Sequence, residues 1–389
     1  MVLKSLKENI KKNKYQAIML TGLENPTAAK NLRYVTGYTG TYGVTIITEK
    51  NQYFLTDFRY RDQVKTECSE FTFIEVEGSL VNAIKQVLKD NHISILGFDK
   101  KMRYQEYETY QKLEVELVPL QDTIESLRLA KQEFEIDRLQ KACDITDQAL
   151  EYTLTLDLVG MKERDVEVIL KSKMLELGAE NTWDRFIVAS GERGAMPHGS
   201  ASDKLIKNNE FVTFDIGCSY KGYTSDLTRT IAFGNPDPKL VEIYNVVYEA
   251  QVKAVKAAKA GMTGKELDSI CRDYITEKGY DLAIDDFGSG VSKLTDVLSG
   301  KLQSIKTDKG MLPLCKKDTK NVKAFSTIIK AVNASGSKVC VEGVETTEQL
   351  EIIIKAGSAS AQGYLFAKPL SYDELIDFIR TFDFDKYQK

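Results

Sequence analysis

The sequence predicts a multidomain protein of the α/β and α+β classes. Short strands and helices alternate over residues 1–125, helices precede a β-hairpin within residues 126–280, and strands alternate with helices again over residues 281–389. The length of 389 residues is enough for two or three domains. An apolar share of 42% is typical of chains that build packed cores.

The charge and cysteine patterns exclude several classes of protein. The 53 basic and 57 acidic residues give a net charge of -4, without long blocks of one sign, so no nucleic-acid surface is predicted. The 6 cysteines are scattered without Cys-x-x-Cys spacing, which indicates reduced thiols instead of disulfides or a zinc site. The Lys-rich N-terminal stretch has no apolar core of signal-peptide length, and no later apolar run is long enough to span a bilayer, so we expect a cytoplasmic protein without membrane contact.

The elements of the first two segments follow from local patterns. A buried strand is predicted at residues 15–20, a strand pair at 44–48 and 52–57, and another strand at 95–99. One helical pattern covers residues 124–156, with an apolar face of Ile136, Leu139, Ala142, Ile145, Ala149 and Tyr152. Further helices are expected at 164–178 and 239–260, and Thr263 and Glu266 form a capping box that opens another helix.

The hairpin of residues 210–234 carries two aspartates. If its turn is centred on Tyr220 and Lys221, Asp215 and Asp226 lie opposite each other with Cβ atoms about 5 Å apart. Carboxylates that close repel unless a cation lies between them or one is protonated. Two metal ions held there would polarise a carbonyl group and supply a hydroxide. The alternative is that both aspartates lie on a solvated face.

The segments around these aspartates resemble a known family. Phe214–Gly217 and Ser225–Thr230 are similar to the two aspartate motifs of the pita-bread metallopeptidases, which include Xaa-Pro aminopeptidase, prolidase and creatinase. The resemblance implies that Asp215 and Asp226 bind Mn, Co or Zn and that the substrate is an Xaa-Pro peptide.

The N-terminal segment adds to this resemblance. Asn31–Gly40 and Leu55–Tyr60 resemble the creatinase-like N-terminal domain of the same family. That domain shapes the substrate entrance and the dimer contact and holds no metal, so the resemblance implies a homodimer.

The histidines of the sequence match the family pattern at one place and depart from it at another. Met196–Gly199 resembles the family segment whose histidine lies near the substrate, which implies a catalytic, substrate-side role for His198. The family also uses a metal-binding histidine and two glutamates later in the chain, and none of them can be placed here. The only other histidine is His92, in the first segment. Two aspartates alone bind metal weakly, so we expect catalysis to be impaired.

A different pattern begins after Tyr280. A strand that runs into a Gly-rich loop is predicted at residues 282–290, and further strands are predicted at 302–308, 338–346 and 361–370. Helices lie between them, which indicates parallel βα units. Their polar residues cluster at the carboxyl ends of the strands, where βα barrels place their chemistry.

These strands resemble the C-terminal half of an EAL domain, the cyclic di-GMP phosphodiesterase barrel. The resemblance covers residues 281–389 and implies half of a (β/α)8 barrel. Asp285 and Asp286 would bind Mg or Mn, Lys306 would contact metal-bound water or phosphate, and Glu342 would be a base. The first half of the barrel and its ligands are missing, so metal binding at this site is also expected to be weak or absent.

We therefore expect a chimera-like chain joined near Tyr280. It would consist of a creatinase-like domain over residues 1–125, the N-terminal half of a pita-bread domain over 126–280, and the half barrel over 281–389. The functional alternatives are an impaired Xaa-Pro dipeptidase or aminopeptidase, an incomplete cyclic di-GMP phosphodiesterase, and a noncatalytic interaction protein or inactive fusion.

Overall fold

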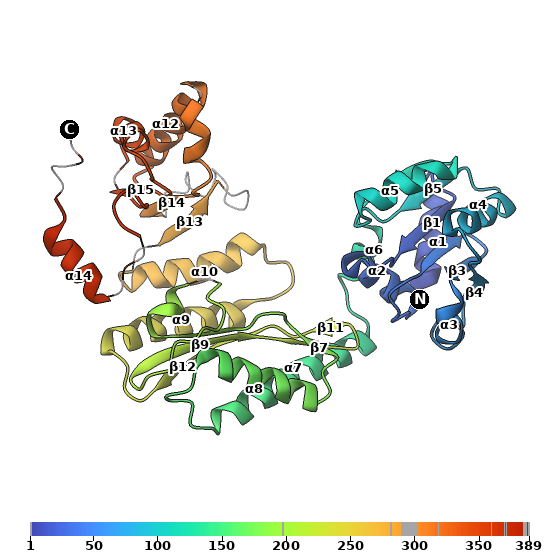
Figure 1. The fold of residues 1–389 in the computed structure, drawn as a ribbon, viewed down its shortest axis with the longest axis horizontal. Helices are drawn as coiled ribbons and strands as arrows, with labels where there is room; N and C mark the ends of the chain where they lie inside the picture. Colours follow the sequence, from blue (N-terminus) through green and yellow to red (C-terminus); the bar gives the residue numbers. More distant parts are fainter. Residues whose placement is uncertain are drawn as a thin grey trace. The chain divides into compact units, whose positions relative to one another are not determined.

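The computed structural model divides the chain into two compact units, Met1–Asn235 and Pro236–Lys389. It describes residues 2–196, 198–280, 282–288, 302–317, 319–358, 360–368, 370, 372–383 and 387. Figure 1 shows the elements of both units and labels many of them. No helix within these described ranges is long and apolar enough to cross a membrane.

The first unit begins with a six-stranded mixed sheet in the order β4-β3-β2-β1-β5-β6. Strands β1, β2 and β3 pair antiparallel, while β4, β5 and β6 each pair parallel with their neighbour. The four strands predicted for this segment are confirmed, and β4 and β6 are additional. The strands are β1 (Ala17–Thr21), β2 (Val44–Thr48), β3 (Gln52–Thr56), β4 (Thr72–Glu75), β5 (Ile95–Phe98) and β6 (Glu116–Pro119).

Helices cover both faces of this sheet because its strands are apolar on both sides. In β1, Ile18 and Leu20 belong to one buried cluster, whereas Ala17 and Met19 belong to another. The first cluster includes buried residues of α1 (Val2–Lys12), α2 (Pro26–Thr36), α3 (Arg61–Glu67) and α6 (Thr123–Leu127), and the second includes those of α4 (Leu80–Asp90) and α5 (Tyr104–Tyr110). The predicted α/β module is therefore a three-layer domain.

The single helix predicted over residues 124–156 is wrong. The chain forms α6, leaves the helical path, and starts α7 (Glu133–Leu154) at a capping box between Gln132 and Glu135. The predicted apolar face is also too wide, because Ile136 and Tyr152 are 55% and 44% exposed while Ala142 is buried. At 100° per residue, these two side chains lie roughly 120° and 80° around the helix from Ala142.

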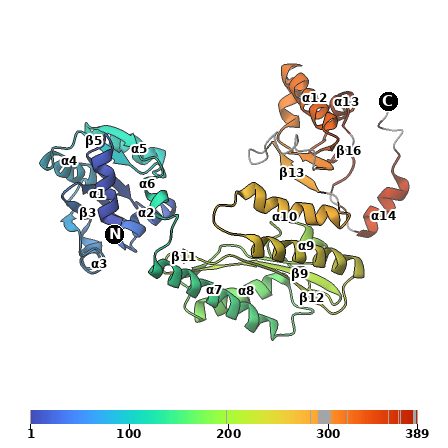
Figure 2. The ribbon, with the colours of Figure 1, turned by 180° about the vertical axis from the view of Figure 1, so that it is seen from behind.

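In the rest of the first unit, two helices pack on two small sheets. Helices α7 and α8 (Glu163–Glu176) contact each other, and both contact strands of these sheets (Figure 2). One sheet has the order β12-β9-β8 and the other β11-β10-β7. Their strands are β7 (Asn181–Thr182), β8 (Ile187–Ser190), β9 (Glu210–Ile216), β10 (Cys218–Tyr220), β11 (Tyr223–Thr224) and β12 (Leu227–Phe233).

The second unit contains a helix pair and a parallel sheet. Helix α9 (Pro238–Ala257) packs on α10 (Gly264–Glu277), which opens with the predicted capping box of Thr263 and Glu266. The sheet runs β13-β14-β15-β16 in chain order with all neighbours parallel, as predicted. The strands are β13 (Ala283–Phe287), β14 (Ser304–Thr307), β15 (Lys338–Val341) and β16 (Ser360–Ala361), so the fourth is shorter than the predicted 361–370.

Helices of the second unit supply much of the core of that sheet. Buried residues of α12 (Thr319–Ala334) and α13 (Thr347–Ala356) join those of β14 and β15 in one apolar cluster. Helix α14 (Tyr372–Thr381) follows. Short 3-10 helices occur in both units at Phe58–Tyr60, Gln111–Leu113, Gly191–Ala195 and Leu312–Lys317.

Candidate active site

Asp215 and Asp226 lie on the predicted hairpin, but they are not directly opposite each other. Asp215 pairs with Thr228, so Asp226 is its diagonal neighbour. A diagonal position separates Cβ atoms by roughly 7 Å instead of about 5 Å. The predicted turn at Tyr220 and Lys221 is wrong by one residue, because Tyr220 pairs with Tyr223 and the turn consists of Lys221 and Gly222.

The alternation of β9 determines which way Asp215 points. Val212, Phe214 and Ile216 are buried in the cluster that includes residues of α7 and α8. Because successive side chains of a strand point to opposite faces, Asp215 lies on the face away from this cluster. It is half-buried, and its Oδ1 accepts a hydrogen bond from the Thr228 hydroxyl at 3.0 Å. Asp226 is exposed.

The segment that carries His198 meets the same sheet. Ser200 forms an isolated antiparallel bridge with Ile187, Ile187 pairs with Asp215, and Asp215 pairs with Thr228. These four residues therefore form one row across the strands, and residues in such a row share a face of the sheet. His198, two residues before Ser200, is exposed. The fold thus brings the His198 segment to the row that contains Asp215.

A buried carboxylate outside the predicted site residues holds this segment. Glu163, in the first turn of α8, is 0% exposed and accepts hydrogen bonds from Ser190, Arg193 and Ser202. Burial raises the pKa of Glu163, but the hydrogen bonds from Ser202 and Ser190 outweigh it and hold the pKa below its ordinary value. In the sequence, a glutamate at the start of a helix indicates only a favourable charge near the helix N-terminus.

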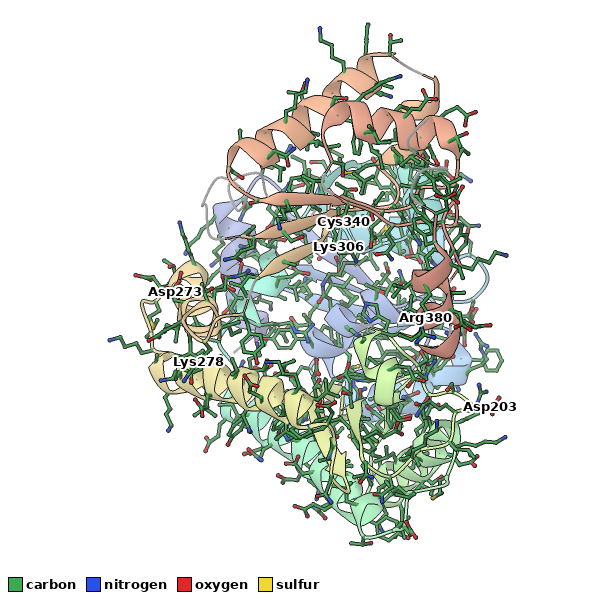
Figure 3. The ribbon with its side chains drawn as sticks, turned by 90° about the vertical axis from the view of Figure 1, so that its left-hand side faces the viewer. Asp203, Asp273, Lys278, Lys306, Cys340 and Arg380 are labelled. Atoms are coloured by element: carbon green, nitrogen blue, oxygen red, sulfur yellow. The ribbon has the colours of Figure 1, made fainter. Side chains whose placement is uncertain are left out.

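The residues predicted from the EAL resemblance all belong to the second unit. Lys306 in β14 lies beside Cys340 in β15 (Figure 3), and its Nζ is 2.5 Å from Oε1 of Glu342, just after β15. The backbone of Asp285 and Asp286 forms part of β13, where the register shifts. The side chains of these two aspartates lie outside the described residues.

Within the described part of the chain, the donors near Asp215 and Asp226 do not fit a two-ion centre. Among the described residues, no three or more His, Cys, Asp and Glu side chains gather in a way that could hold a metal ion. The sequence also contains only two histidines. Two carboxylates offer fewer donors than a pair of divalent ions requires.

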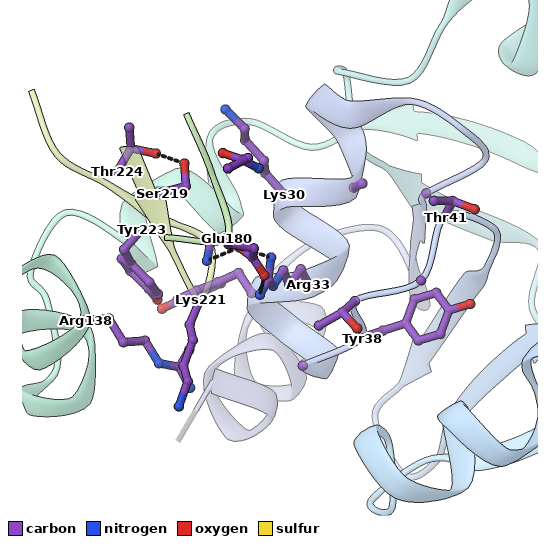
Figure 4. Close-up of a pocket in the computed structure, with 18 of the residues that line it drawn as sticks. Lys30, Arg33, Tyr38, Thr41, Arg138, Glu180, Ser219, Lys221, Tyr223 and Thr224 are labelled. Carbon is purple, nitrogen blue, oxygen red and sulfur yellow. Dashed lines mark hydrogen bonds and ion pairs between the residues drawn. The ribbon is translucent and has the colours of Figure 1, made fainter. Parts of the chain in front are cut away.

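A large cavity lies at another place in the first unit. Its volume is about 1260 Å³, and it is lined by residues of α2 and of the β10–β11 hairpin, but by none of the predicted site residues (Figure 4). At this place Arg33 forms a bidentate pair with Glu180, at 2.8 and 3.1 Å. The same carboxylate accepts a hydrogen bond from the backbone of Gly222 at 3.0 Å.

The fold and the family matches together place the chain in the pita-bread metallopeptidase class with a creatinase-like N-terminal domain. Residues 137–312 match metallopeptidase family M24, and residues 3–130 match the creatinase/prolidase N-terminal domain. Together with the relatives described next, these matches show that the chain belongs to the M24 family. The M24 match continues past residue 280, where we expected the pattern to change.

The relatives point to the same family. The uncharacterized peptidase YqhT of Bacillus subtilis is 43% identical over 257 residues, which are 65% of this chain and 73% of that protein. The Xaa-Pro dipeptidase of Pyrococcus furiosus is 43% identical over 211 residues, 54% of this chain and 60% of that protein. The structure of an Xaa-Pro dipeptidase from Bacillus anthracis superposes with a TM-score of 0.67 at 39% identity, covering 72% of this chain and 78% of that one.

Proposed function

We propose that this protein is an Xaa-Pro dipeptidase-like member of the M24 family that binds Xaa-Pro peptides but hydrolyses them poorly. The observation that carries the proposal is the row formed by Ser200, Ile187, Asp215 and Thr228, which aligns the His198 segment with the first aspartate. The names of the Pyrococcus furiosus and Bacillus anthracis relatives support the substrate class.

The expected impairment follows from the number of metal ligands. Asp215 and Asp226 supply carboxylate oxygens, and one oxygen of Asp215 is already hydrogen-bonded to Thr228. The later histidine and glutamates implied by the resemblance have no counterpart that we can place. Manganese, cobalt or zinc would therefore bind weakly, and water would fill most of the coordination positions.

The test combines metal analysis with a peptidase assay. After dialysis against Mn, Co or Zn, we expect substantially less than one tightly bound ion per chain, and a further decrease in the double variant Asp215→Asn, Asp226→Asn. Hydrolysis of Ala-Pro is expected to be at least about a hundredfold slower than by a prolidase with all its ligands. Asp203→Asn is the control, because this carboxylate is 72% exposed and lies outside the aspartate pair. Stoichiometric metal with rapid hydrolysis would refute the impairment.

A second candidate concerns the second unit. We propose that residues 281–389 are an EAL-like half barrel, with a border at residue 280 that joins two family remnants. Support comes from the four parallel strands in chain order and from the Lys306–Glu342 pair at their carboxyl ends. Neither of the two matching families is a cyclic di-GMP phosphodiesterase.

Calorimetry with cyclic di-GMP in the presence of Mg or Mn tests this second candidate. Binding that is lost in Lys306→Met would support it, and no binding at millimolar nucleotide would refute it. If the chain neither binds Ala-Pro nor binds cyclic di-GMP, the noncatalytic or inactive alternative is the correct one. A homodimer and a cytoplasmic location remain predictions, which sedimentation and cell fractionation would test.

A further inference from the structure

Glu163 contacts the residues that flank the segment of residues 191–196 and 198–201, which carries His198. Its Oε1 accepts hydrogen bonds from the backbone and the hydroxyl of Ser190, at 2.8 and 2.7 Å, where the segment begins. Its Oε2 accepts those of Ser202, at 3.1 and 2.6 Å, where the segment ends. One carboxylate therefore holds the beginning and the end of the segment together.

Arg193 ties the interior of the segment to the same carboxylate. Its Nε donates to Oε2 of Glu163 at 2.9 Å, and its Nη2 donates to the backbone oxygen of Ser200 at 2.6 Å. The guanidinium group thus connects the buried charge to the residue that bridges to the Asp215 sheet. A charge-assisted hydrogen bond is stronger than a neutral one, particularly where water is excluded.

The backbone of α8 adds to the connection. The amide of Glu163 donates to the backbone oxygen of Lys204, and the amide of Arg164 donates to that of Ser202, both at 3.0 Å. The start of the helix is therefore fixed against the end of the segment independently of the side chain. Replacing the carboxylate should for this reason disturb the segment more than it disturbs the helix.

We propose that Glu163 is a positioning residue, which fixes the segment of residues 191–196 and 198–201 so that His198 is presented beside the Asp215 face of the sheet. This inference rests on the proposed function only in giving His198 a substrate-side role. Glu163 does not itself touch the substrate. A carboxylate that served only to stabilise the fold would not be expected to control the response of His198 to peptide.

The presence of only two histidines makes a direct spectroscopic test possible. In a chain labelled with 15N-histidine, His198 reports on the segment and His92, in the N-terminal domain, is an internal reference. Glu163→Gln keeps the size of the side chain but removes its charge. Asp165→Asn is the matched control, because Asp165 is an exposed carboxylate in the same turn of α8.

We expect Glu163→Gln to shift or broaden the imidazole signals of His198 and to leave those of His92 unchanged. The shift of His198 on addition of Ala-Pro should be lost in Glu163→Gln and kept in Asp165→Asn. Unchanged His198 signals and an unchanged peptide response in a folded Glu163→Gln variant would overturn the proposal.

A misfolded Glu163→Gln variant and a missing response to Ala-Pro can each be distinguished from failure of the proposal. If Glu163→Gln also perturbs the signals of His92, that variant is misfolded and Ser202→Ala takes its place, because it removes one donor and leaves the carboxylate. Ser202→Ala should perturb the signals of His198 alone. Unchanged His198 signals in Ser202→Ala would overturn the proposal. If Ala-Pro does not shift His198 in the unmodified chain, the proposed function fails. The positioning role is then still decided by the His198 signals without peptide.

Discussion

The hydroxyl of Thr228 donates a hydrogen bond to Asp215 Oδ1 at 3.0 Å, and Thr228 is the residue directly opposite Asp215 in the hairpin. Asp226 is consequently displaced by two residues from the position expected from the sequence. The turn determines this register, because the residues paired across a hairpin follow from the two residues at its tip.

The tip of the hairpin is a turn in which both residues have positive φ. Lys221 has φ of 47° and Gly222 has φ of 83°, as in a type I′ turn. Lys221→Val should destabilise the chain by about 1–2 kcal/mol, because a β-branched side chain is strained at positive φ. Lys221→Asn should be neutral or stabilising, since asparagine favours this conformation. Urea unfolding would measure both, and equal midpoints would contradict the turn assignment.

The face of the sheet that is packed against the helices should be sensitive to cavities. Phe214 is 0% exposed in the core cluster of α7, α8 and β9. Phe214→Ala should lower the free energy of unfolding by about 3–5 kcal/mol. Ala232→Ser, at an exposed position of β12, serves as the control and should change it by less than about 0.5 kcal/mol. Thermal unfolding with both variants decides whether this face is a packed core.

The Arg33–Glu180 pair should contribute a pH-dependent part of the stability. The hydrogen bonds from Arg33 lower the pKa of Glu180 from its ordinary value of 4.5, although burial opposes them. A lowered carboxyl pKa stabilises the fold above the ordinary value, and this contribution is lost as the pH falls through the folded value.

Glu180→Gln should therefore cost about 0.2–1 kcal/mol at pH 7, because both side chains are partly exposed and solvent screens the pair. The difference from the unmodified chain should shrink as the pH falls below about 4. Urea unfolding at pH 7 and at pH 3.5 would measure this. A difference that grows on acidification would contradict the assigned direction of the pKa shift.

Lys306 and Glu342 should be energetically coupled within the second unit. Their side chains are 31% and 16% exposed, and they link β14 to the residue after β15. A double-mutant cycle with Lys306→Met and Glu342→Gln should give a coupling of about 1 kcal/mol in urea unfolding. Strictly additive effects would show that the pair does not stabilise the unit, irrespective of cyclic di-GMP binding.

The sequence by itself determined the features that depend on near neighbours in the chain. The apolar runs at Val44–Thr48 and Ile95–Phe98 became strands, and Thr263 and Glu266 formed their capping box. The alternation of strands and helices after residue 280 gave a parallel sheet. Local propensity, capping and hydrophobic spacing act over a few residues, so they can be read directly from the sequence.

Only the tertiary structure decided the features that depend on residues distant in the chain. This group includes the pairing of Asp215 with Thr228 and the exposure of Ile136 and Tyr152. It also includes the hydrogen bonds by which Glu163 connects Ser190 and Ser202. A carboxylate near the start of a helix is ordinarily solvated, and nothing in its own sequence neighbourhood indicates that Ser190 and Ser202 will surround it. Its burial and its hydrogen bonds exist only after α8 has packed against the segments before β9, because those contacts join residues that folding alone brings together.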